Sequence, residues 1–229
     1  MGFNEMTHAF IAAKYYVYLT EAFGERGKEA FLHATRYYAE QRGRRMAQRA
    51  IRDGQPLNYE TYSRYSEWMG TEDAIAQGLG NKVTVESMSP DYEMHIFVCP
   101  WHAQFKAMGL TEAGLLYCRD LDASICRGFN PEMSYVVSQT LHDHDYCIQT
   151  IKDAGVDENS NMAKLPGGIR TFEYHCAHSY WSYYETAAAI FGPEGESAGR
   201  KVIRDFANEY GEEMADILLG YEGTNFNVI

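Results

Sequence analysis

Two segments of this chain, 168 positions apart, resemble each other along their whole length. Tyr15–Ala47 and Tyr183–Ala215 align without gaps and are identical at 11 of 33 positions. Each contains an FGxxG motif between two stretches of helical periodicity, and glycines at fixed spacing mark unusual backbone. Each segment is therefore predicted to form a helix, a tight turn and a second helix, which Gly43 or Gly211 would end. A chance agreement between two Ala-rich amphipathic helix pairs is the alternative interpretation.

A duplication of this kind constrains how the chain can pack. Each hairpin has a stripe of Ala, Tyr and Phe that is too extensive to leave in water, because apolar burial is worth ~25 cal/mol per Å². Matching repeats offer each other matching stripes. We therefore expect the hairpins to superpose and to pack side by side around the central segment, related by a pseudo-twofold axis. Apolar surface that they leave exposed would favour a homodimer.

Between the repeats the hydrophobic pattern changes from helical to alternating, which indicates β-strands. Four segments alternate and are joined in pairs by polar turns, so they predict two hairpins: Lys82–Glu86 with Tyr92–Val98, and Met133–Leu141 with Tyr146–Ile151. A helix is predicted over 112–127, capped by Thr111 and closed by Gly128. A further helix is predicted over 60–76, and the polar residues 153–168 are expected to form a loop.

The order of these elements predicts an α+β fold. One four-stranded antiparallel sheet, of the form ββ–helices–ββ, would be flanked by the two similar helical hairpins. No stretch has the composition of an independent linker, so residues 1–229 are expected to form a single domain. It would comprise N-terminal helices in 1–80, the sheet and a site helix in 81–152, and the C-terminal hairpin in 169–220.

Charge and hydropathy argue against two classes of partner. The net charge is −12 at pH 7, whereas proteins that bind nucleic acid carry a surplus of Lys and Arg, and the one basic run, 42–52, is too short to alter this. No apolar stretch approaches the ~20 residues that cross a bilayer. The N-terminus has no signal-peptide pattern, so we expect a cytoplasmic protein. Five cysteines, an odd count, indicate free thiols.

Reactive side chains are concentrated in the 49 residues from Cys99 to Cys147, which hold four of the five cysteines and three of the eight histidines. Thiols, imidazoles and carboxylates bind metals, attack electrophilic carbon and transfer protons. Cys118 and Asp122 lie four positions apart on one face of the predicted site helix, and apolar neighbours turn that face inward. A carboxylate buried there needs a hydrogen bond, an ion pair or a ligand.

The predicted strands bring further such side chains toward this helix. His95, Phe97 and Cys99 share one strand face, His142 follows another strand, and Cys147 begins the return strand. If these faces meet the helix, one pocket is lined by Cys99, Cys118, Asp122, His142 and Cys147. A slip of one residue in strand register would reverse the arrangement.

A metal site has weak support, because the sequence lacks the paired CxxC and the HExxH spacings of strong zinc motifs. His142 and His144, with the aspartates beside them, would either bind a borderline cation or form a solvated acidic turn. We expect no cofactor, while a divalent metal such as zinc stays an open alternative. His175 and His178 lie among aromatic residues and would either wall a ligand pocket or belong to the core.

Three short features of the central segment together resemble the L-2-amino-thiazoline-4-carboxylic acid hydrolase family. They are Cys118-Arg-Asp-Leu-Asp122, Gly128-Phe-Asn-Pro131 and a β-hairpin that ends at Cys147. With the flanking helices and their FG turns, the resemblance covers most of the chain. It implies hydrolytic opening of a cyclic C=N bond to give an N-carbamoyl amino acid. The order of the cysteines is more distantly similar to vinyl-reductase-type small-ligand sensor domains, some of which hold zinc, but the DHDYC turn departs from their pattern.

The predicted function is a hydrolase that opens a small cyclic C–N or C=N substrate, amidine- or imide-like, by thiol and carboxylate chemistry. Cys118, or a water assisted by Cys147, would attack; Asp122 would hydrogen-bond the amidinium; and His142 would supply a proton. The predicted substrate-binding residues are Cys99, His102, Asn130 and His178. The alternative is a non-catalytic small-molecule-binding or sensor module, with a metal as an option.

Overall fold

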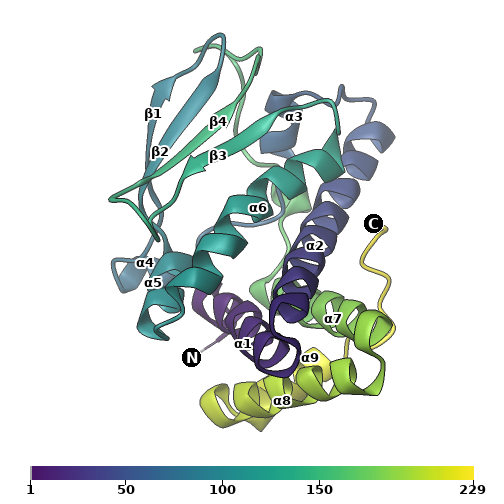
Figure 1. Cartoon of the computed structure of the whole chain (residues 1–229). Helices are drawn as coiled ribbons and strands as arrows, with labels where there is room; N and C mark the ends of the chain where they lie inside the picture. The colour runs from purple at the N-terminus through teal and green to yellow at the C-terminus, as the bar shows by residue number, and fades with distance from the viewer. Residues whose placement is uncertain (1) are drawn as a thin grey trace.

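The structure, a computed structural model, describes residues 2–229 and combines helices with a four-stranded antiparallel sheet (Figure 1). This confirms the predicted α+β class. The strands are β1 (Lys82–Ser87), β2 (Tyr92–Val98), β3 (Tyr135–Gln139) and β4 (Cys147–Ile151). The helices are α1 (Glu5–Phe23), α2 (Glu25–Arg52), α3 (Tyr59–Arg64), α4 (Glu72–Ala76), α5 (Pro100–Ala107), α6 (Thr111–Phe129), α7 (Phe172–Phe191), α8 (Pro193–Tyr210) and α9 (Glu212–Leu219), and a short 3₁₀ turn spans Pro166–Gly168.

The sheet has the strand order β1-β2-β4-β3, so the two predicted hairpins pair through β2 and β4. Helix α6 lies across one face of the sheet, and α2 packs against α6 (Figure 1). In the antiparallel register Ile96 of β2 pairs with Cys147 of β4, and Met94 pairs with Gln149. These four side chains share the face that is turned toward α6, because alternate residues of a strand point to the same side.

The opposite face of β2 carries His95 and Phe97. Both rings lie against Tyr146, with centroids 4.7 and 5.4 Å away, and Phe97 is 40% exposed. The expectation that this face meets the site helix is therefore wrong. Cys99 nevertheless reaches the inner side, because it lies beyond the end of β2 at the N-cap of α5, where the chain changes direction.

The helix predicted over 60–76 is interrupted in the structure. Between the end of α3 and the start of α4 the chain turns inward and buries the side chain of Glu67 completely. Thr71 then caps α4, and Glu5 accepts hydrogen bonds from its backbone N–H and its hydroxyl at 2.9 and 2.6 Å. The continuous helix that the periodicity predicts does not form here, because the buried carboxylate of Glu67 has to reach its hydrogen-bond donors.

Two glycines that were expected to end helices lie inside them instead. Gly43 is in the middle of α2, and α6 continues past Gly128 to Phe129. A Cβ at Gly43 would lie 2.0 Å from the carbonyl oxygen of Ile125, and a Cβ at Gly128 would lie 2.3 Å from that of Glu40. Helices α2 and α6 thus cross with backbone against backbone, and both positions are glycine because no side chain fits.

The two helical hairpins share their turn geometry. Gly24 and Gly192 adopt φ values of 58° and 59°, in the region that favours glycine. A Cβ at Gly27 would lie 1.9 Å from the carbonyl oxygen of Leu19. In the second hairpin, a Cβ at Gly195 would lie 2.0 Å from the carbonyl oxygen of Ala187. The same close contact therefore recurs in both hairpins.

Equivalent aromatic residues of the two hairpins stack on each other. The ring centroids of Phe23 and Phe191 are 3.7 Å apart, and those of Tyr15 and Tyr183 are 5.0 Å apart. Helix α1 packs against α8, and reciprocally α2 packs against α7. Contacts between equivalent residues and between equivalent helices are those of two hairpins related by a pseudo-twofold axis. The copies differ at their ends, because α2 continues to Arg52 whereas Gly211, with φ 100°, separates α8 from α9.

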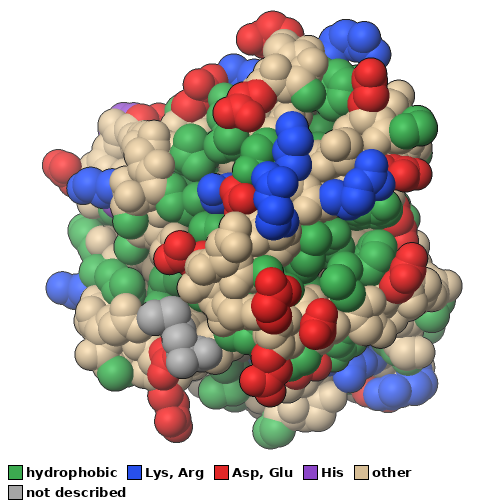
Figure 2. Space-filling model, turned by 90° about the horizontal axis from the view of Figure 1, so that it is seen from below, with side chains coloured by type: hydrophobic (Ala, Val, Ile, Leu, Met, Phe, Trp, Pro, Cys, Tyr) green, Lys and Arg blue, Asp and Glu red, His purple; other side chains and the backbone are tan. Residues whose placement is uncertain are grey.

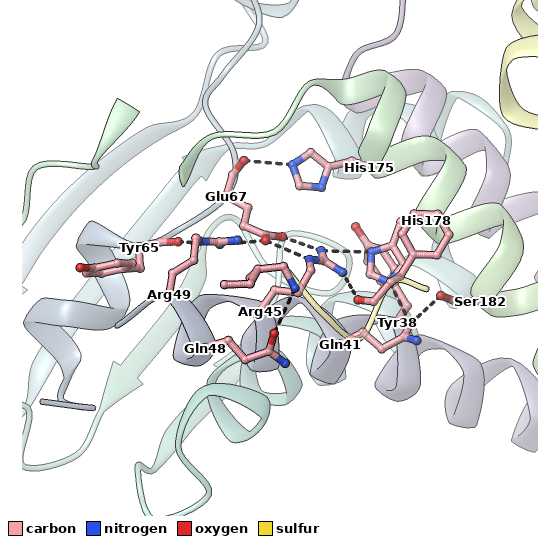
Figure 3. A network of polar contacts seen from close by, with 12 residues as sticks. Tyr38, Gln41, Arg45, Gln48, Arg49, Tyr65, Glu67, His175, His178 and Ser182 are labelled. Atoms are coloured by element: carbon pink, nitrogen blue, oxygen red, sulfur yellow. Dashed lines mark hydrogen bonds and ion pairs between the residues drawn. The ribbon is translucent and has the colours of Figure 1, made fainter. Parts of the chain in front are cut away.

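A buried ionic network joins α2 to the segment before α4 (Figure 3). Glu67 accepts hydrogen bonds from Arg45 at 2.6 and 3.1 Å and from Arg49 at 2.8 Å. Burial alone would raise the pKa of Glu67, but the two guanidinium groups hold it at about 2. On α7, His175 donates to the backbone carbonyl of Glu67, and His178 accepts from Arg45.

One face of the molecule, seen from below in Figure 2, is mixed in character. Acidic, basic and apolar side chains are interspersed over the face that Figure 2 shows, without a continuous basic area on that face. Within residues 2–229, no helix is both long enough and apolar enough to cross a membrane.

Replacing Glu67 by Gln should destabilise the protein by about 3–5 kcal/mol, because the Arg45 and Arg49 charges would stay buried without a carboxylate. Chemical denaturation monitored by circular dichroism measures this change in the free energy of unfolding. Glu196→Gln is the matched control: it removes an exposed ion pair with Arg200 on α8 and should cost no more than about 0.5 kcal/mol. Equal effects of the two substitutions would contradict the importance of the network.

Candidate active site

A cavity of about 260 Å³ lies between the inner face of the sheet and helices α2, α3 and α6. Four residues of the predicted pocket line it together: Cys99, Cys118, Asp122 and Cys147. Much of the remaining lining is aromatic, and these side chains come from several elements: Tyr59, Tyr62, Trp68, Trp101, Tyr117 and Tyr135. An apolar cavity of this size with a few polar groups suits one small molecule rather than a polymer.

His142, the fifth residue of the predicted pocket, is not part of the lining but contacts it through Cys118. Its Nε2 atom lies 3.4 Å from the Sγ atom of Cys118. The imidazole packs against Gly114 of α6 so closely that a Cβ there would lie 2.1 Å from its Cε1 atom. Helix α6 therefore supplies the thiol and also the space in which the imidazole reaches it.

Burial determines the protonation state of this pair. It lowers the pKa of His142 to about 4, with a further contribution from His102, and it raises the pKa of the Cys118 thiol well above its usual value. At neutral pH the pair is accordingly a neutral thiol beside a neutral imidazole. The Nδ1 atom of His142 is buried and makes no hydrogen bond to any residue in 2–229.

The turn that carries His142 is held by its neighbours in sequence. The backbone N–H of Leu141 donates to Sγ of Cys147 at 3.3 Å, and the hydroxyl of Thr140 donates to the carboxylate of Asp143 at 2.7 Å. Cys147 therefore both lines the cavity and fixes the turn. This contact ties the position of His142 to the first residue of β4.

Asp122 is held from the sheet side. Nε2 of Gln149 donates to its Oδ2 atom at 2.9 Å, and the hydroxyl of Tyr135 donates to Oε1 of Gln149 at 2.6 Å. Burial raises the pKa of Asp122, an effect that Arg42 and the Gln149 hydrogen bond partly offset. A carboxyl group whose pKa is raised by burial is suited to proton transfer, and its ionised form is suited to binding a cationic group.

Two cationic side chains also line the cavity. Arg42 comes from α2, and Lys164 comes from the loop before α7. The ammonium group of Lys164 donates to the backbone carbonyl of Trp68 at 2.6 Å and lies 4.5 Å from the centre of that indole ring. Burial, followed by the charge of Arg42, lowers the pKa of Lys164 to about 8.

One wall of the cavity is fixed by a buried histidine. Nε1 of Trp101 donates to Nδ1 of His8 at 3.0 Å, so the proton of this imidazole is on Nε2, which lies 2.9 Å from the hydroxyl of Tyr38. Burial lowers the pKa of His8 well below its usual value, which keeps the ring neutral. The indole of Trp101 is thereby locked in one orientation beside the cavity.

The other residues that we predicted to bind substrate lie outside the lining. The ring of His102 is 4.9 Å from that of His142, in a perpendicular arrangement. Asn130 caps α6 and donates to the backbone carbonyl of Leu57 at 2.8 Å. His178 is buried in the network of Figure 3. In the chain from residue 2 onward, no group of three or more His, Cys, Asp or Glu residues is arranged to hold a metal ion.

Sequence reasoning missed Arg42, Lys164, Gln149 and most of the aromatic lining. A signal for Arg42 was present, because it shares one helix face with Tyr38 four positions before it and with Arg45 three positions after it. Gln149 follows Cys147 by two positions and so belongs to the same strand face. Lys164 lies in a predicted loop, and nothing in its local sequence distinguishes it.

We expect all five cysteines to react slowly with iodoacetamide at neutral pH, because burial raises the pKa of every thiol, to about 12 for Cys99, Cys126 and Cys176. Labelling rates from mass spectrometry of peptides should still increase above pH ~10, where an ordinary thiol with a pKa of about 8.5 is almost fully ionised. Denatured protein is the control and should label rapidly. A cysteine of the native protein that labels fast, with a plateau below neutral pH, would contradict this protonation state.

Comparison with known proteins gives one finding that bears on this site. The model of the family described as L-2-amino-thiazoline-4-carboxylic acid hydrolase matches residues 4–147, which include Arg42, Cys118, Asp122 and His142. A search of curated proteins and a search of solved structures each gave no significant match. Because the family match covers more than half of the chain, the protein belongs to the L-2-amino-thiazoline-4-carboxylic acid hydrolase family.

Proposed function

We propose that this protein hydrolyses a small cyclic amidine in the cavity between the sheet and α6, with Cys118 as nucleophile. The description of its family supports hydrolysis of a cyclic substrate. The observation that carries the proposal is the meeting, in one cavity of about 260 Å³, of a thiol paired with an imidazole and a buried carboxylate one helical turn away. Attack on a carbon between two heteroatoms needs these three kinds of group.

In this proposal Asp122 binds the amidinium group of the substrate, whose two N–H groups match the two oxygens of a carboxylate. Gln149 keeps the carboxylate in place through its hydrogen bond to Oδ2. A cation bound there lies one helical turn from Sγ of Cys118 and lowers the thiol pKa that burial raises. The thiol is then activated by the substrate itself, which explains why a buried neutral thiol suits the site.

The reaction proceeds in two balanced stages. Sγ of Cys118 adds to the amidine carbon while the thiol proton passes to Nε2 of His142; the ring heteroatom then leaves with that proton, which opens the ring. Water next adds to the carbon bound to sulfur, and the C–S bond to Cys118 breaks, which restores the thiol and leaves a carbonyl group on the product. Cys147 assists by holding the turn that carries His142. The net change is addition of one water molecule.

Activity of this kind is tested with aminothiazoline, imidazolinone and hydantoin-like rings, whose opening mass spectrometry detects as a gain of one water. Cys118→Ala should abolish turnover, and Asp122→Asn should lower kcat/KM at least ~100-fold, because general acid–base and charge-assisted contacts contribute on that scale. Cys126→Ala is the matched control: this buried thiol lies two turns further along α6, outside the cavity lining, and its loss should leave kcat unchanged. Full activity of Cys118→Ala would refute the proposal.

The role of His142 can be tested by displacing its imidazole as well as by removing it. Gly114→Ala would place a methyl group 2.1 Å from Cε1 and displace the imidazole from Cys118, so we expect kcat to fall at least ~10-fold. In a His142→Ala background the same substitution should have no further effect, since the methyl group then has space. Steady-state kinetics of the four proteins of this cycle measure the coupling. Additive effects would show that Gly114 acts other than through His142.

A further inference from the structure

One buried charge of α2 has no hydrogen-bonded partner of opposite charge, although it lies close enough to Asp122 to offset part of the pKa shift of that carboxyl group. Arg42, Arg45 and Arg49 follow one face of this helix, and all three side chains are buried. Arg45 and Arg49 share Glu67. Arg42 makes no hydrogen bond or ion pair with any residue in 2–229, and its Nε atom is among the buried polar atoms that lack a partner. Arg42 as a whole is only 6% exposed to solvent.

A guanidinium group in this situation is costly for the folded protein. It remains charged at any pH at which proteins fold, and burial of an unpaired charge is strongly unfavourable. The nearest aromatic compensation is the ring of Tyr38, whose centre lies 5.8 Å from the guanidinium carbon. Arg42 lines the cavity, so its free donors are accessible to a molecule bound there.

The charges around the cavity favour an anion. Its charged lining residues are Arg42, Lys164 and Asp122, two cations against one carboxylate whose pKa is raised. Lys164 and Arg42 are close enough for the charge of Arg42 to disfavour protonation of the amine. An anion between the two groups would relieve this repulsion and would accept the hydrogen bonds that Arg42 does not make.

We propose that Arg42, with Lys164, forms the receptor for a carboxylate group of the substrate. The inference rests on the proposed function for the identity of the ring. The description of the family already names a ring that carries a carboxylic acid, and the inference assigns recognition of that group to Arg42 and Lys164. Such a ligand places its amidinium on Asp122 and its carboxylate on Arg42, so both charged ends contact buried groups of opposite sign. The planar guanidinium fork matches the two oxygens of a carboxylate, which a point charge does not.

The receptor is tested by binding, without turnover. The probes are 2-aminothiazole-4-carboxylate, an aromatic ring that resists hydrolysis, and its carboxamide, and calorimetry measures both affinities. Wild-type protein should bind the carboxylate at least ~10-fold more tightly than the carboxamide. Arg42→Gln should lose this preference, Arg42→Lys should retain part of it, and Lys164→Gln should weaken it. Arg44→Gln, which alters an exposed arginine of the same helix, should preserve it.

Thermal denaturation separates a receptor from a structural cation. Arg42→Gln removes an unpaired buried charge, so its Tm should equal or exceed that of wild type while the preference for the carboxylate disappears. A large loss of Tm would identify Arg42 as a structural residue and overturn the proposal. So would an unchanged preference in Arg42→Gln, or failure of the wild type to prefer the carboxylate.

The outcome is independent of catalysis. If the protein binds the carboxylate as described but opens no ring, the receptor stands and the proposed hydrolysis fails. If the protein opens carboxylate- and carboxamide-bearing aminothiazolines with equal kcat/KM, hydrolysis stands and the receptor fails.

Discussion

Helices α2 and α6 approach until their backbones touch, at Gly43 on one and Gly128 on the other. No side chain separates them, so the residues on either side of the crossing are held at fixed relative positions. Arg42 lies next to the crossing on α2, and Asp122 lies less than two turns before Gly128 on α6. The two charged groups of opposite sign that line the cavity are therefore positioned by one contact. A methyl group at either glycine would force the helices apart and change the distance between them.

The three buried arginines of α2 differ in their partners. Arg45 and Arg49 share the single carboxylate of Glu67, which lies where the predicted helix is interrupted. This pairing joins α2 to the sequence that also supplies Trp68 to the cavity. Arg42 is left without such a carboxylate. Stability alone would favour a neutral residue there. An arginine that costs stability beside a cavity is typical of a residue kept for what it binds.

Much of the architecture followed from local sequence pattern. Alternation located the four strands, and the Cys118–Asp122 spacing placed a thiol and a carboxylate on one helix face, because both properties depend only on residues near in sequence. The errors occur where the local structure is determined by a contact with a residue that is distant in the sequence. Gly43 was wrongly expected to end a helix. The close contact that requires glycine there is with Ile125, which lies 82 positions away in the sequence. The break before α4 and the burial of Arg42 depend likewise on tertiary contacts, so the cationic part of the site was not foreseen.

The stacking of Phe23 on Phe191 and of Tyr15 on Tyr183 has a consequence for how such a chain arises. These are isologous contacts, in which a residue meets its own copy, and they ordinarily join the two subunits of a symmetric dimer. Here both halves are parts of one polypeptide, so they are free to diverge. The counterparts of Arg42, Arg45 and Arg49 in the second copy are Tyr210, Glu213 and Ile217. Covalent joining of the halves has thus left them free to differ in sequence, so that the buried arginines of α2 have no arginine counterparts in the second half.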